Sequence, residues 1–178
     1  MTVESNPSRS PTQSASAGDV LMDGVITGML GALAVALWFL ILDLIGGRPL
    51  FTPSLLGAVL LHGSQAAAGQ VTIAPLEIAA YTAFHLVSFV LVGIVLSWLM
   101  NLFERFPIMF FVLLVLFLCL MIGFFGIDAA LGASLVGRLR AWTVVVANLL
   151  AAAAMAFYQW KRHPGALKAV DQLWEHER

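Results

Sequence analysis

Residues 78–103 read IAAYTAFHLVSFVLVGIVLSWLMNLF, and none of these 26 residues is Asp, Glu, Lys or Arg. A segment of about 20 apolar residues is long enough to cross the hydrocarbon core of a bilayer as a helix. In hydrocarbon a helix satisfies its own backbone hydrogen bonds, which a lone strand cannot do. The stretch therefore predicts a transmembrane helix and makes lipid the solvent for this part of the chain.

The composition of the whole chain favours the same class of protein. Of its 178 residues, 61% are hydrophobic and 11% are charged, whereas soluble domains average about 25% charged residues. A net charge of -1 indicates no nucleic-acid partner, because phosphate binding needs clustered Lys and Arg. The only cysteine, Cys119, excludes an internal disulfide and a cysteine-based metal cluster. The expected partner is the lipid bilayer, with a homo-oligomer or a larger membrane complex as further possibilities.

Three more charge-free stretches complete a predicted bundle of four transmembrane helices. The spans cover about 24–45, 76–103, 107–127 and 140–160. The predicted fold is thus an all-α integral membrane protein with its transmembrane domain at 19–163. Residues 1–18 are rich in Ser and Pro and are expected to form a disordered polar tail.

Two shorter helices are predicted outside the spans. Thr52 and Pro53 resemble an N-cap and a first-turn proline, which predicts a short helix over about 53–63, either interfacial or re-entrant. Over 164–178, apolar and polar residues fall on opposite faces of a helix, which predicts a cytoplasmic amphipathic helix. That helix lies on the membrane surface or packs on a partner subunit.

The distribution of Lys and Arg predicts the orientation. With four spans, one side carries six basic residues: Arg9, Arg105, Lys161, Arg162, Lys168 and Arg178. The other side carries three: Arg48, Arg138 and Arg140. Because cytoplasmic loops carry the excess of positive charge, both termini are expected in the cytoplasm, and a bacterial inner (plasma) membrane is the expected location.

The first span has a face of small residues. Gly24, Gly28, Gly31 and Ala32 fall within about 100° on a helical wheel. Small residues let helices approach closely in lipid. This face is therefore predicted to be a main packing surface, either inside one chain or across a dimer.

The second span has a polar face. Glu77, Tyr81, His85 and Ser88 follow spacings of 4, 4 and 3, within about 80° of one another. A polar face on a membrane helix must meet protein or water. In the fourth span, Asn148 is interpreted as forming an interhelical hydrogen bond rather than binding a ligand.

A candidate site follows from polar residues predicted on the same outer side. Asp43 and His62 are expected near Glu77, Tyr81 and His85 in the outer half of the bundle. One hypothesis is a purely structural network. Alternatively the group binds a ligand or relays protons, and His85 and His62 are the residues that would ligate haem b or a metal ion.

No enzyme motif of the Walker, Rossmann or zincin type occurs. The favoured function is therefore a non-enzymatic multi-pass accessory or scaffold module. The alternatives are a haem- or metal-linked redox protein and a small proton or solute transporter. The residues alone do not identify a substrate.

Overall fold

The computed structural model describes residues 16–63, 65–68, 72–103, 115, 117–119, 121–123, 125–126 and 139–162. Its helices are α1 (Ala17–Ile45), α2 (Phe51–His62), α3 (Gln65–Ala68), α4 (Pro75–Phe103) and α7 (Ala141–Arg162). The predicted all-α class is confirmed. Most of the predicted tail and third span, and the whole predicted helix at 164–178, lie outside the described residues.

Three of the described helices are long and apolar enough to cross a membrane. These segments are Ala17–Ile45, Pro75–Met100 and Ala141–Arg162. Large apolar side chains cover their outer surfaces, as at Val87 on α4 and Leu149 on α7, which are 60% and 58% exposed. Such surfaces suit contact with lipid rather than water.

Helices α1 and α4 run antiparallel in close contact. A β-carbon added to Gly24 would lie 2.5 Å from the Cα of Ile94, and one added to Gly28 would lie 2.5 Å from the Cα of Val90. Real β-carbons do not come this close, so the two backbones touch only because these positions are glycine. The glycine face of α1 therefore lies against α4 within the chain.

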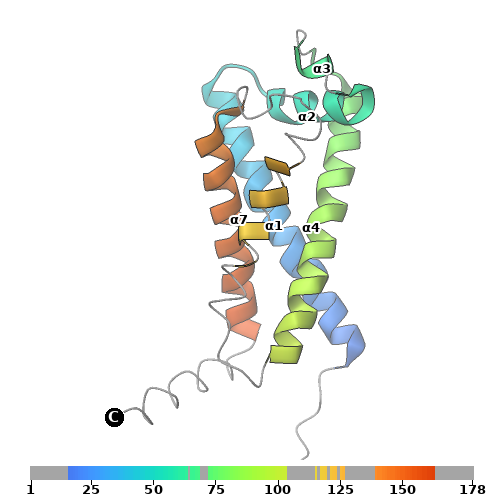
Figure 1. The fold of residues 1–178 in the computed structure, drawn as a ribbon, viewed down its shortest axis with the longest axis vertical. Coiled ribbons are helices and arrows are strands. Elements are labelled where there is room, and N and C mark those ends of the chain that lie inside the picture. The colour runs from blue at the N-terminus through green and yellow to red at the C-terminus, as the bar shows by residue number, and fades with distance from the viewer. Residues whose placement is uncertain are drawn as a thin grey trace, which may run out of the picture.

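Helix α7 also runs antiparallel to α1 and packs on the other side of it (Figure 1). The Trp38 indole nitrogen donates a hydrogen bond to the Thr143 carbonyl oxygen at 3.0 Å. A β-carbon added to Gly31 would lie 2.7 Å from the Met155 sulfur. Since both α4 and α7 are antiparallel to α1, they are parallel to each other.

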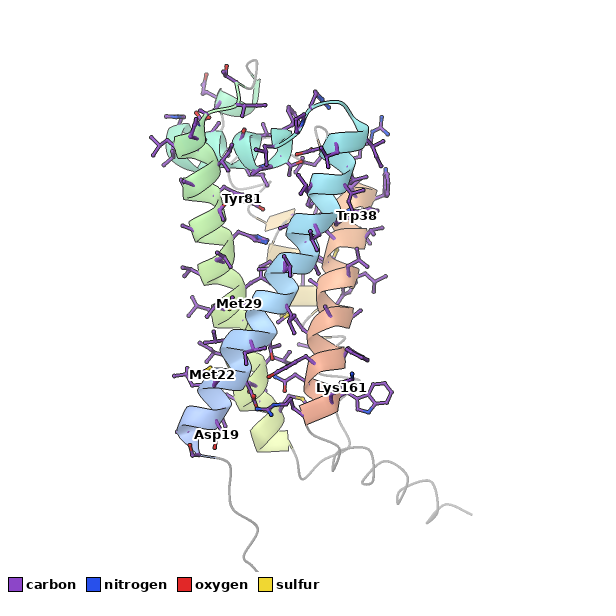
Figure 2. The ribbon with its side chains drawn as sticks, turned by 180° about the vertical axis from the view of Figure 1, so that it is seen from behind. Asp19, Met22, Met29, Trp38, Tyr81 and Lys161 are labelled. Atoms are coloured by element: carbon purple, nitrogen blue, oxygen red, sulfur yellow. The ribbon has the colours of Figure 1, made fainter. Side chains whose placement is uncertain are left out.

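Helix α2 lies across one end of the bundle, over the end of α1 and the start of α4 (Figure 1). We call this the α2 end. Gly57 brings α2 against the backbone of Glu77 in the first turn of α4. Figure 2 shows Tyr81 on α4 near this end, and Asp19 and Lys161 at the opposite end. The α2 helix thus covers one end of the bundle (Figure 1).

Two helix starts differ from the predictions. Helix α1 begins at Ala17, inside the predicted tail, because Ser16 and Asp19 form a reciprocal capping box. Helix α2 begins at Phe51 instead of 53, and Thr52 is not its N-cap. The Thr52 backbone amide is satisfied by a side chain from another helix.

Candidate functional site

His85 lies on α4 and turns its ring toward α1. Its Nε2 is 3.2 Å from the Ala32 carbonyl oxygen, and its Nδ1 is 3.5 Å from the Tyr81 hydroxyl. A carbonyl oxygen can only accept, so Nε2 donates to Ala32, and in the neutral ring Nδ1 then accepts from the Tyr81 hydroxyl. The ring also stacks on Tyr81 and tilts against Phe89. Both ring nitrogens therefore have a partner within the protein.

This arrangement leaves no free nitrogen on His85 for a metal. His62, the other predicted metal ligand, lies in the last turn of α2. It approaches the carboxylate of Glu77, with Nε2 3.4 Å from Oε1. Glu77 is eight residues before His85 on α4, or about 12 Å along the helix axis. Within the described residues, no group of three or more His, Cys, Asp or Glu side chains is placed to hold a metal ion.

Asp43 lies at the junction of α1 and α2 and is hydrogen-bonded there to Thr52. Its carboxylate accepts from the Thr52 backbone amide at 2.7 Å and from the Thr52 hydroxyl at 2.8 Å. Asp43 is 7% exposed, so its oxygens are satisfied by these bonds rather than by water. The five predicted site residues therefore form three separate interactions, and only Tyr81 and His85 contact each other inside the bundle.

A partly open cavity of about 470 Å³ lies between α1, α2, α4 and α7. Its volume falls in the range of small-molecule sites, about 300–1,000 Å³. Most of the lining is aliphatic or aromatic. Representative apolar residues are Val35 and Phe39 of α1, Leu56 and Val59 of α2, Phe84 of α4 and Val144 of α7. Cys119 and Gly123 also line it.

Four polar side chains from two helices reach this cavity. Tyr81, His85 and Ser88 come from α4, and Asn148 comes from α7. Asn148 is only 9% exposed. The predicted interhelical hydrogen bond is not found, because none joins the Asn148 amide to another described residue. An unpaired polar group in an apolar interior costs about 1–3 kcal/mol, so this amide favours a polar partner inside the cavity.

A second polar cluster, at the end of the bundle opposite α2, was missed by the sequence analysis. The Arg162 Nη2 lies 2.6 Å from an Asp23 carboxylate oxygen, which also accepts from the Tyr158 hydroxyl at 3.2 Å. Next to them, Gln159 Nε2 donates to the Thr27 hydroxyl at 3.0 Å. Asp23 and Thr27 are four residues apart, a spacing that could have revealed a polar face at the start of α1.

This second cluster joins the start of α1 to the end of α7. Its members pair mainly with one another, and none of them lines the cavity. In the described structure the cluster therefore links α7 to α1.

Comparison of the chain with protein-family models, curated proteins and solved structures gives no match.

Proposed function

We propose that this chain is a non-enzymatic, multi-pass membrane protein that holds a small, mostly apolar molecule inside its helical bundle. The observation that supports it is the cavity of about 470 Å³ with its largely apolar lining and few polar groups. Pockets of that size and lining are typical of small-molecule sites. As a binding module, the protein would serve as an accessory subunit in the membrane.

The proposal includes four membrane spans, with both termini in the cytoplasm. Helices α4 and α7 are parallel, so α4 ends at one face of the bundle and α7 begins at the other. A connection between parallel neighbours must cross from face to face, and the charge-free stretch 107–127 is long enough to do so. The described residues between 115 and 126 are helical, which agrees with this proposal. The six-to-three excess of Lys and Arg supports the orientation.

In this proposal α2 is the interfacial cover of the cavity. Leu56, Val59 and Leu60 face the cavity from α2. His62, at the end of the helix, has a side chain that is 58% exposed. A helix with one face on the bundle and a polar end is suited to the membrane surface.

The proton-relay and haem alternatives have less support. A relay through Asp43, Glu77 and His85 needs these groups in contact, but Asp43 pairs with Thr52 and Glu77 pairs with His62. Haem or metal ligation by His85 would first have to break a hydrogen bond to Ala32 or Tyr81. Binding of an apolar molecule requires neither change.

Photolabelling tests the proposal. The protein, reconstituted in lipid nanodiscs, is irradiated with a ten-carbon alcohol that carries a diazirine, and labelled peptides are mapped by mass spectrometry. We expect labels on cavity residues of α4 and α7. Ser88→Phe, which places a ring in the cavity, should reduce this labelling. Val87→Phe, on the exposed face of the same helix, is the matched control and should not.

A second occluding variant guards against a folding defect. Leu60→Trp enlarges a cavity residue of α2 that is 44% exposed, so the bundle core is not disturbed. Melting temperatures are measured for all variants. Labelling confined to lipid-facing residues, and unchanged in both occluding variants, would refute the proposed function.

A further inference from the structure

The cavity has no charged lining residue among those the structure describes. Asp, Glu, Lys and Arg are all missing from its described walls. The one imidazole in the lining has both ring nitrogens in contact with protein groups, Nε2 with the Ala32 carbonyl oxygen and Nδ1 with the Tyr81 hydroxyl. A charged ligand would lose its hydration and find no counter-ion, which is a large cost in an apolar interior.

The free hydrogen-bonding capacity of the cavity lies on two facing helices. Asn148 of α7 and Ser88 of α4 both line it, and neither is hydrogen-bonded to another described residue. Tyr81 and His85 already satisfy each other. Asn148 is therefore the strongest available group, since a primary amide offers two donors and an acceptor.

The position of these groups places the polar contact inside the membrane. Asn148 is seven residues after Ala141, or about 10 Å along α7, and His85 is ten residues after Pro75, or about 15 Å along α4. The hydrocarbon core is about 30 Å thick. A molecule bound here has its polar group at a depth where water is scarce, with apolar walls around the rest of it.

Resting on the proposed function, we infer that the cavity selects an uncharged lipid-like molecule with one oxygen group, a carbonyl or a hydroxyl, which hydrogen-bonds to the Asn148 amide. Ser88 is placed to assist from α4. The apolar body of the molecule packs on Phe39, Val59 and Phe84. Anionic and cationic amphiphiles of the same length are excluded.

Competition against the same photoprobe tests this selectivity. Unlabelled 1-decanol, decane and decyl sulfate are added at equal mole fractions in the lipid phase. In the wild-type protein, decanol should displace the probe at a concentration about threefold to tenfold lower than decane. This ratio is the gain in affinity expected from one net hydrogen bond. Decyl sulfate, charged at every pH, should not displace it.

Two variants test whether Asn148 causes the preference for decanol over decane. Asn148→Leu keeps the size of the side chain and removes its polar atoms, so decanol and decane should become equal competitors. Leu149→Ala, on the exposed face of α7, is the matched control and should keep the preference. The inference would be overturned if Asn148→Leu kept the preference for decanol, or if decyl sulfate displaced the probe as well as decanol does. Labelling of the cavity would in that case still support a binding site. No cavity labelling at all would overturn both.

Discussion

The Asp43 carboxylate binds the first turn of α2 through both of its oxygens, one on the Thr52 amide at 2.7 Å and one on the Thr52 hydroxyl at 2.8 Å. The acid comes from the end of α1, so one helix caps the next. A carboxylate at a helix start satisfies an unpaired amide and interacts favourably with the helix dipole. This contact joins the end of α1 to the start of α2, the helix that covers the cavity.

Removing that cap should loosen α2 before the rest of the bundle. Asp43→Ala loses both bonds and leaves a buried amide unpaired, so we expect a loss of about 1–2 kcal/mol in the free energy of unfolding. Hydrogen exchange should show faster amide exchange in α2 than in α1 or α7. Thr52→Val keeps the amide bond and should cost less. A double-mutant cycle that gave no coupling between Asp43 and Thr52 would contradict this account.

The close approach of α1 and α4 predicts sensitivity to one methyl group. In Gly28→Ala the new carbon would meet the backbone of Phe89 and Val90, which cannot move aside as a side chain does. We expect a loss of about 1–3 kcal/mol, as found for overpacked interiors. Gly123→Ala is the control, because no atom of the described part of the chain lies within 4 Å of a β-carbon added there. Equal melting temperatures for the two variants would show that α1 and α4 do not pack this closely.

The cluster opposite α2 contains one unsatisfied buried atom, the Gln159 side-chain oxygen. Gln159→Met removes it, and the Thr27 hydroxyl still donates to the Asp23 carbonyl, so stability should stay the same or rise by up to about 1 kcal/mol. Thr27→Val instead leaves the Gln159 amide without its partner and should be destabilising. Thermal unfolding of both variants and the double variant is the measurement. Strong destabilisation by Gln159→Met alone would indicate a partner for that oxygen.

His85 is expected to contribute to stability without holding a metal. His85→Ala removes the imidazole that contacts both the Tyr81 hydroxyl and the Ala32 carbonyl. The free energy of unfolding should fall by about 1–3 kcal/mol. Iron, copper and zinc contents and the visible absorption spectrum should equal those of wild type, because both ring nitrogens are already bonded. His62→Ala is the comparison, since its exposed side chain should matter little for stability. Stoichiometric haem or metal in the wild type, lost in His85→Ala, would restore the ligand hypothesis.

Topology can be read with reporter fusions. Fusions after residues 18 and 163 should both report the cytoplasm, and one at residue 70 should report the outside. The reasons are the excess of Lys and Arg on the terminal side and the parallel direction of α4 and α7. A fusion at residue 178 that reported the outside would end the four-span proposal.

The helices themselves could be predicted from the amino-acid sequence. The spans predicted near 24–45, 76–103 and 140–160 became α1, α4 and α7, because the length and polarity needed to cross a bilayer are local properties of a segment. The small residues of α1 and the polar residues of α4 were likewise visible as faces, since helical spacing alone decides which side chains share a side.

What those faces contact was decided only by the tertiary structure. Asp43 was expected with His85 and pairs with Thr52, and Asn148 was expected to bond a neighbouring helix but opens on the cavity. Asp23 and Arg162, 139 residues apart, form an ion pair that no local pattern indicated. The physical reason is that helical periodicity defines the side of one helix but not its rotation or axial position against another. Those depend on close packing, which for α1 and α4 is set where glycine lets two backbones touch.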